Sequence, residues 1–249
     1  MKSSLLLRSK GFTLMETVIA VGVVAVLLTG FIVVFGPAAQ SIKRSINAQM
    51  ADNLVGALER DLVTVRPDDD DDYFKDKPGF SKGFDYIKES DKEATALVVY
   101  QYRGSTSDTR GDGTPDPVEK PTDDEAPGKD YVVTTIMRRI DPNNLEDVFI
   151  KDLGALEGPV FLVKTTQLVF DGGELKLGEP GKIKHLPDGS TSLQVASDTD
   201  AYSEAVIAFS ADFYDLPGRN EAFFTGDGFG KAFNKAGKPL FSRNLAIRR

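Results

Sequence analysis

Cysteine and tryptophan are absent from this 249-residue chain, and its only histidine is His185. Without cysteine the chain can form no disulfide and perform no thiol chemistry, so an exported domain must be held by its core or by a metal ion. A single imidazole with no thiolate also argues strongly against zinc sites and Cys-His catalysis. We expect His185 at the end of a strand or in a turn.

Other enzyme signatures are missing as well. The glycine-rich stretch GDGFGK at residues 226–231 lacks the spacer and the Ser or Thr after lysine that define a phosphate-binding loop. We expect this stretch to form a turn near the C-terminus. Because nothing in the sequence points to a catalytic pair of carboxylates either, we predict that the chain is not an enzyme.

Basic residues are outnumbered by acidic ones, 30 to 38, which gives a formal net charge of −8. An acidic surface repels the phosphates of nucleic acids and the headgroups of anionic lipids. The sequence shows no basic patch interleaved with aromatic residues. We therefore expect no nucleic-acid partner.

Charge is nearly missing from residues 12–36, where Glu16 is the only charged residue. A helix of this length reaches roughly 37 Å at about 1.5 Å per residue, enough to cross a hydrocarbon core of about 30 Å. The basic residues Lys2, Arg8 and Lys10 precede it without an acidic one. Because such a flank keeps its end in the cytoplasm, the chain beyond the apolar run is expected outside it.

An ordinary secretory signal is a competing interpretation of this N-terminus. Residues 36–38 offer only a poor cleavage site of the small-x-small type. The apolar run also exceeds the usual length of about 7–15 residues for the core of a signal peptide. Both observations favour a membrane-spanning helix.

Glu16 is the unusual residue of the apolar run. A carboxylate inside a spanning helix costs something like 2.5–3.5 kcal/mol on insertion scales, unless it snorkels toward the headgroups or finds a partner. A cut between Gly11 and Phe12 would create an ammonium group close to Glu16. That cation could offset the carboxylate in the same chain or in a neighbouring one.

Lys10 and the sequence GFTLMET at residues 11–17 resemble the prepilin cleavage and methylation motif of type IV pilins and type II secretion pseudopilins. The resemblance implies that a prepilin peptidase cuts after Gly11 and methylates the new N-terminus at Phe12. It also implies that Glu16 pairs with the N-terminus of an adjacent subunit during assembly. Met15 departs from the motif, where Leu or Val is commoner.

The resemblance also implies an organisation of the whole chain. Residues 1–11 would be the leader, 12–36 a transmembrane and assembly helix, 37–65 its amphipathic continuation, and 66–249 a β-rich domain outside the cytoplasm. The implied partners are a prepilin peptidase, other pilin or pseudopilin subunits and a bacterial inner membrane, with the C-terminal domain in the periplasm or at the cell surface. The alternative is an uncleaved, membrane-anchored binding module.

Residues 37–65 are predicted to be an amphipathic helix. Pro37 cannot donate to the carbonyl of Val33, so we expect a kink or a local break there. Apolar residues then recur every four positions, which predicts a stripe that packs against a sheet. The stripe consists of Ile42, Ile46, Met50, Leu54, Leu58 and Leu62, widened by Ala51 and Val55.

The remainder of the chain is dominated by strand signals. Five consecutive aspartates at residues 68–72 repel one another and end the helix, and the segment from there to Glu93 is predicted to be a loop held to the core by aromatic residues. Residues rich in β-branched and aromatic side chains predict strands. These strands are expected at residues 96–102, 131–137, 147–150, 160–170 and 205–214, with a turn at 172–173.

Consecutive strands without intervening helices predict a mainly antiparallel sheet, and therefore an α+β fold with one long N-terminal helix packed on it. Pilin-like folds have this shape. The sequences LERDL at residues 58–62 and FSADFYD at residues 209–215 resemble those of J-class minor pseudopilins and related minor pilins. A tryptophan common in that class is missing here, but the large size of the chain favours a minor or tip subunit.

The sequence DTRGDGTPD at residues 108–116 resembles the aspartate-rich loops that bind calcium, because alternate carboxylates before a glycine turn can supply several oxygen ligands. Arg110 stands where such loops usually carry a ligand, and a solvated hairpin loop is the alternative. Residues 110–112 also spell the Arg-Gly-Asp tripeptide associated with integrin binding, a match that arises easily by chance. The candidate calcium ligands are Asp108, Asp112 and Asp116, assisted by Asp123 or Asp124.

Overall fold

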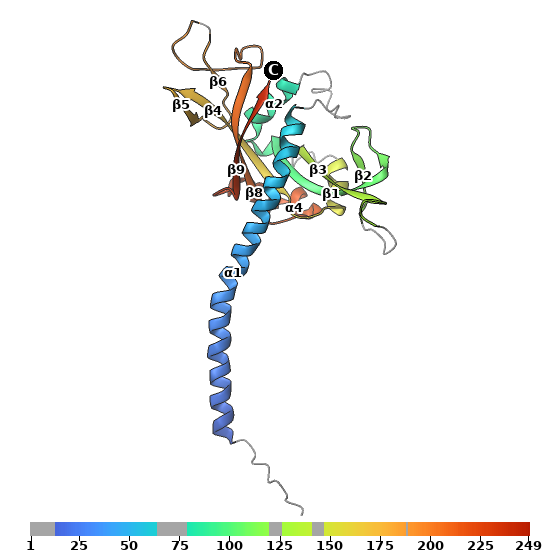
Figure 1. Cartoon of the computed structure of the whole chain (residues 1–249), viewed down its shortest axis with the longest axis vertical. Helices are drawn as coiled ribbons and strands as arrows, with labels where there is room; N and C mark the ends of the chain where they lie inside the picture. Colours follow the sequence, from blue (N-terminus) through green and yellow to red (C-terminus); the bar gives the residue numbers. More distant parts are fainter. Residues whose placement is uncertain (1–12, 64–78, 120–125, 141–146, 188) are drawn as a thin grey trace, which may run out of the picture. The chain divides into compact units, whose positions relative to one another are not determined.

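The computed structural model describes residues 13–63, 79–119, 126–140, 147–187 and 189–249 (Figure 1). The chain divides into two compact units, Met1–Ile46 and Asn47–Arg249. The described part of the first unit consists of the start of helix α1. The second unit contains the rest of that helix and all the described strands.

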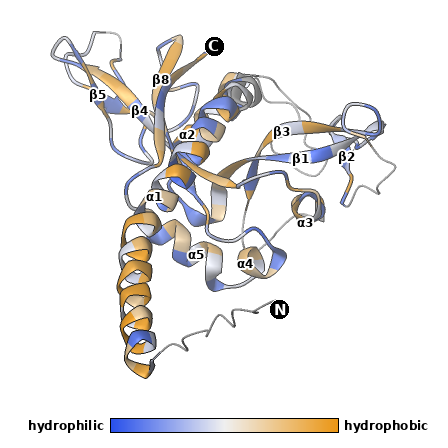
Figure 2. Ribbon diagram, turned by 60° about the horizontal axis from the view of Figure 1, so that its bottom comes forward, coloured by the Kyte–Doolittle hydropathy of each residue, from blue (hydrophilic) through white to orange (hydrophobic). Residues whose placement is uncertain are grey.

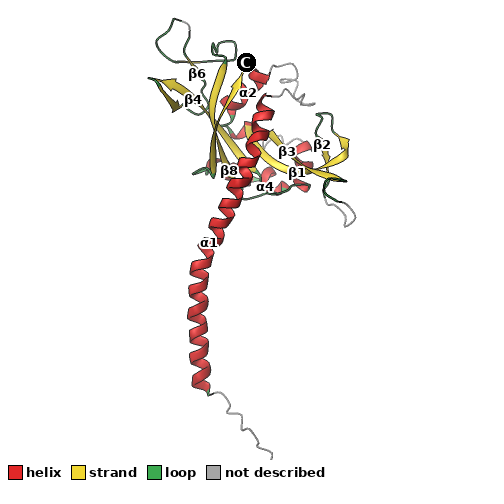
Figure 3. Ribbon diagram, viewed as in Figure 1, coloured by secondary structure: helices red, strands yellow, loops and turns green. Residues whose placement is uncertain are grey.

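Helix α1 spans Leu14–Val63 and is drawn as one continuous ribbon in Figure 3. It passes through Pro37 without interruption, so of the kink or local break expected there the break does not occur, and the kink stays a prediction. Proline removes a single helical hydrogen bond, and the residues on either side still form theirs. Helix α1 is therefore one element over both the apolar run and the amphipathic stretch.

A seven-stranded sheet lies at the centre of the second unit. Its main path runs β2-β1-β4-β8-β9, with β3 beside β1 and β5 beside β4, and these pairings are all antiparallel. The strands are β1 (Ala96–Thr109), β2 (Pro115–Pro117), β3 (Tyr131–Ile140), β4 (Phe161–Asp171), β5 (Glu174–Leu177), β8 (Val206–Asp215) and β9 (Phe241–Arg248). The predicted α+β class with a long helix on an antiparallel sheet is thus confirmed.

The long strands lie where the sequence pattern places them, although β1 continues to Thr109, beyond the predicted end at residue 102. The predicted strands at 96–102, 131–137, 160–170 and 205–214 correspond to β1, β3, β4 and β8. The expected turn between β4 and β5 is made by Gly172 and Gly173, whose φ angles of 62° and 86° are the positive values that a tight hairpin turn requires. His185 ends the short strand β6 (Lys184–His185), which pairs with β7 (Gln194–Val195).

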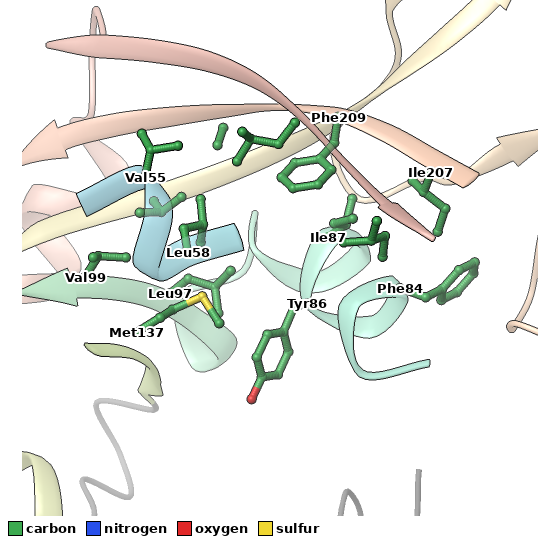
Figure 4. Packing of buried hydrophobic residues seen from close by; sticks show 14 of the residues in the cluster. Val55, Leu58, Phe84, Tyr86, Ile87, Leu97, Val99, Met137, Ile207 and Phe209 are labelled. Atoms are coloured by element: carbon green, nitrogen blue, oxygen red, sulfur yellow. The ribbon is translucent and has the colours of Figure 1, made fainter. Parts of the chain in front are cut away.

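The central part of the sheet is buried on both faces. One face carries Leu97 and Val99, which pack with Leu58 of α1 and with helix α2 (Gly79–Glu89), as Figure 4 shows. The other face carries Val98 and Tyr100, which belong to a second cluster with the helices α3 (Asp147–Gly154), α4 (Glu221–Thr225) and α5 (Asp227–Asn234). Because neighbouring residues of a strand point to opposite faces, both must be apolar when both faces are covered.

The predicted stripe of α1 is confirmed from Ala51 to Leu58, whereas the side chain of Leu62 lies outside the described part of the structure. Ala51, Leu54, Val55 and Leu58 are buried, and they form the contact of α1 with the sheet. Ile42 and Ile46, by contrast, remain 61% and 47% exposed. They lie before Asn47, where the compact second unit begins.

Two segments expected to lack helix are helical. The segment before Glu93 was expected to be a loop, but residues Gly79–Glu89 form helix α2. Its core residues Phe80, Phe84 and Ile87 follow helical spacing, but Gly83 between them and Gly79 at the helix start have low helix propensity and obscure it. Likewise, the expected turn at 226–231 lies mostly within α5, where Phe229 and Phe233, four residues apart, face the core.

The short strand expected at residues 147–150 is also wrong, because this stretch begins helix α3. The local sequence VFI favours a strand by composition alone. In the structure Phe149 is 1% exposed and Asp152, three residues later, is fully buried on the same side of the helix. Tertiary packing of this face overrides the local preference.

Candidate anchoring and assembly site

The first part of helix α1 is apolar around its whole circumference (Figure 2). From Leu14 to Phe35, every large apolar side chain is more than half exposed. This helix is long and apolar enough to cross a membrane. A helix without a polar face is expected inside a bilayer or among other apolar helices, because water would otherwise contact all of this surface.

Glu16 lies in the first turn of α1 and bonds to Thr13, the residue immediately before the helix. The backbone N–H of Thr13 donates to Oε2 of Glu16 at 2.9 Å, and the Thr13 hydroxyl donates to the same oxygen at 3.0 Å. In return, the N–H of Glu16 lies 3.2 Å from the Thr13 hydroxyl oxygen. This reciprocal arrangement is a capping box, which satisfies backbone donors that the helix itself leaves open.

The capping box changes how the charge of Glu16 is accommodated. Its carboxylate accepts hydrogen bonds from its own chain and lies at the positive end of the helix dipole. The negative charge is therefore stabilised even without a partner from another subunit. Gly11 and Phe12, the proposed cleavage site, lie outside the described residues.

Thr13 is a residue of this site that the sequence reasoning missed. The signal was present, since Thr followed three residues later by Glu before an apolar run is the signature of a capping box. The sequence interpretation of Glu16 as an acid inside the membrane did not include its role as the glutamate of a capping box.

The carboxylates of the candidate calcium loop bond to different partners. Asp108 accepts from the hydroxyls of Ser105 and Ser107 at 3.2 and 2.7 Å. Asp112 accepts from the backbone N–H and the hydroxyl of Thr114 at 2.8 and 2.5 Å. These bonds occupy both aspartates with donors of the protein itself.

Two arginines form ion pairs with aspartates of this loop. Arg110 Nε lies 3.4 Å from Oδ1 of Asp116, and Arg138 Nη2 lies 3.3 Å from Oδ2 of Asp112. Both arginines also reach Asp152 of helix α3, a residue that the sequence reasoning did not single out. Because the Arg110 and Asp112 side chains are only 10% and 11% exposed, the Arg-Gly-Asp tripeptide is not displayed for a receptor.

The surroundings of Asp112 and Tyr100 determine their protonation. Burial opposes ionisation of Asp112, but the hydrogen bonds from Thr114 and the charge of Arg138 lower the pKa of this carboxyl below its ordinary value. Burial raises the pKa of Tyr100 well above its usual range, so its hydroxyl stays a neutral donor. Both effects favour a fixed pattern of charges near the loop.

An open polar cavity of about 530 Å³ lies beside the same loop. Asp108 and Asp116 line it, together with Asp130, whereas Asp112 does not. Within the described ranges, no group of three or more His, Asp or Glu side chains is arranged to hold a metal ion. Asp123 and Asp124, the other expected ligands, lie outside those ranges.

The single histidine occupies a structural position. His185 is 6% exposed, and its Nδ1 lies 2.9 Å from the Ser203 hydroxyl oxygen, while its ring lies against that of Tyr202. These contacts connect β6 to the segment that precedes β8. They form a packing contact within the second unit.

Comparison of the chain with models of protein families, with curated proteins and with solved structures finds no match.

Proposed function

We propose that this chain is a pilin-like structural subunit, cleaved after Gly11 by a prepilin peptidase and assembled into a type IV pilus or a type II secretion pseudopilus as a minor or tip subunit. The observation that carries the proposal is the start of α1, where a helix apolar on all sides bears one acid at its very beginning. The N-terminal motif that includes Gly11 and Phe12 supports it. In this proposal the bacterial inner membrane holds the helix before assembly, with the C-terminal domain outside the cytoplasm.

The exposed apolar surface suits both stages of such a life cycle. In the membrane, the side chains from Leu14 to Phe35 contact lipid. In a filament, helices of other subunits replace the lipid around the same side chains. The helix keeps its backbone hydrogen bonds in both settings, so the exchange alters only what surrounds it.

The geometry at Glu16 is compatible with pairing between subunits. Thr13 donates to Oε2, whereas an ionised carboxylate offers about four acceptor sites over its two oxygens. The amino group freed at Phe12 of an adjacent subunit can therefore bind without breaking the capping box. Such a pair sets the register of neighbouring helices, because an unpaired charge among apolar helices is costly.

Replacement of the acid tests the proposal in the host membrane. Glu16→Ala is expected to leave membrane insertion intact and to lower incorporation into the filament about tenfold or more. Glu59→Ala, on an exposed position of the same helix, is the matched control and is expected to assemble normally. Normal incorporation of Glu16→Ala would contradict the pairing of subunits through this residue.

The uncleaved membrane-anchored binding module is favoured by one observation of its own. Because Thr13 already supplies donors to Glu16, the acid is tolerable at the helix end without a new amino terminus. The intact mass of the protein extracted from membranes distinguishes the two functions. Loss of residues 1–11, with or without a methyl group on Phe12, supports the subunit, and retention of the leader supports the anchored module.

A further inference from the structure

Asp152 is a fully buried carboxylate that makes contacts through both of its oxygens. Oδ1 lies 2.5 Å from Arg110 Nη2, and Oδ2 lies 3.2 Å from Arg138 Nε. The Tyr100 hydroxyl donates to Oδ2 at 2.5 Å. A buried charge is tolerated only when it is paired and hydrogen-bonded, and Asp152 meets both conditions.

The two arginines extend these contacts into the loop at residues 108–116. Arg110 connects Asp152 to Asp116, and Arg138 connects Asp152 to Asp112. Each guanidinium thus lies between two carboxylates, one from helix α3 and one from the loop. A divalent cation bound by an aspartate-rich loop is likewise surrounded by carboxylate oxygens. The two guanidinium groups therefore have the kind of surroundings that such a cation would have.

The loop also closes on itself through hydrogen bonds of its backbone. The N–H of Arg110 donates to the carbonyl of Thr114 at 2.7 Å, and the N–H of Gly113 donates to the carbonyl of Arg110 at 2.9 Å. Gly113 has a φ of 75°, which the turn requires and which side chains other than that of glycine rarely allow. These two bonds close the turn with groups of the chain alone, while Nη1 of Arg110 is a buried nitrogen without a hydrogen-bond partner among the described residues.

We propose that Arg110 and Arg138 take the place of a bound divalent cation in this aspartate-rich loop and fasten it to α3 through Asp152. The loop then keeps its conformation without calcium. Because the chain has no cysteine, no disulfide can hold this part of the domain together. The buried ion pairs connect the β1–β2 turn to helix α3 instead. The inference concerns the second unit alone and does not depend on the function proposed for the N-terminus.

Calcium dependence of the wild-type chain is the first test. Thermal unfolding of the full-length protein in detergent micelles is followed by circular dichroism, once with millimolar calcium chloride and once with excess EDTA. The proposal expects the two Tm values to agree within about 1 °C. Calcium at about a hundred times its Kd would instead raise Tm by roughly 5–10 °C. Such a rise, abolished in Asp116→Asn, overturns the proposal.

The arginine itself provides the second test. Arg110→Met leaves Asp116 and part of the charge of Asp152 without a partner, and it is expected to lower Tm by roughly 6–20 °C in both buffers. Arg243→Met is the matched control, since Arg243 is 58% exposed and lies 3.9 Å from Asp52, and its Tm is expected to change by no more than about 2 °C. An unchanged Tm for Arg110→Met overturns the proposal. If this variant does not accumulate as folded protein, the Tm values of the wild-type protein with and without calcium still test whether the loop needs calcium.

Discussion

The hydroxyl of Tyr100 on β1 donates a 2.5 Å hydrogen bond to the carboxylate of Asp152 on α3, and both side chains are fully buried. The bond joins the middle of the sheet to a helix on its second face. It also orients the carboxylate toward Arg110 and Arg138. A neutral donor from the strand thus helps to fix the position of a charged group on which the neighbouring loop depends.

Tyr100→Phe should destabilise the second unit through loss of this bond. A hydrogen bond to a charged group contributes about 1.5–3 kcal/mol, so the free energy of unfolding should fall by roughly that amount. Urea unfolding of the full chain in micelles measures it. Tyr102→Phe is the comparison, because the Tyr102 hydroxyl donates to the neutral carbonyl of Pro115, and its cost should be nearer about 1 kcal/mol. Equal effects for the two variants would contradict the special role of Asp152.

Leu58→Ala should open a cavity where α1 meets the sheet. Leu58 is fully buried, and truncation of a buried leucine costs about 2–5 kcal/mol. Ile42→Ala on the same helix is the control, because Ile42 is 61% exposed and should cost no more than about 0.5 kcal/mol in the same unfolding experiment. Similar losses at both positions would mean that the boundary at Asn47 is wrong.

Thr13→Ala should weaken the start of α1. The substitution removes the side chain that caps the helix, at a cost of about 0.5–2 kcal/mol, and it leaves Glu16 with fewer donors. Hydrogen exchange of the first-turn amides in micelles should become faster, whereas Thr13→Ser, which keeps the hydroxyl, should retain the wild-type rates. Thr29→Ala is the matched control, since the Thr29 hydroxyl donates to the carbonyl of Ala25 within the helix and does not cap its end. Unchanged exchange in Thr13→Ala would show that the capping box does not protect the helix end.

Acid should remove the contribution of Asp112 to stability. The pKa of Asp112 is lowered in the folded chain, so its stabilising effect is present above the unfolded pKa of about 3.9 and is lost as pH falls through the lower folded value. Asp112→Asn should therefore be less stable than wild type near neutral pH. The difference in Tm between the two proteins should shrink as pH falls below about 4. A difference that is constant with pH would rule out ionisation of Asp112 as its source.

Much of the sheet was predictable from the sequence because its long strands are rich in β-branched and aromatic residues. The pattern of the same strands also indicates what covers the sheet. Residues 96–100 are apolar without alternation, which indicates burial on both faces and hence a second layer of helices. The helices α3 to α5 supply that layer. They escaped prediction because all three are short, because the sequence of α3 favours a strand by composition, and because Gly228 and Gly230 weaken the helical pattern of α5.

The charged cluster around Asp152 could not be predicted from the sequence in the same way. Its members come from β1, β3, α3 and the turn after β1, and only the folded topology brings them together. The aspartate-rich sequence of the loop suggested calcium, and the presence of Arg110 within it was the one local sign of another arrangement. Nothing in the order of residues reveals that Arg138, on a different strand, completes the cluster.

The core of the second unit begins on α1 close to Asn47. This boundary determines which fragment of the C-terminal part is suited to crystallisation from aqueous solution. A fragment that starts just before Asn47 omits the exposed apolar segment from Leu14 to Phe35, while it keeps Leu54 and Leu58 in the core. A fragment that begins only after Val63, the last residue of the helix, would remove Ala51, Leu54, Val55 and Leu58 from the core cluster to which Leu97 also belongs. The starting residue of the fragment therefore determines whether apolar core residues stay covered, and exposed ones favour aggregation.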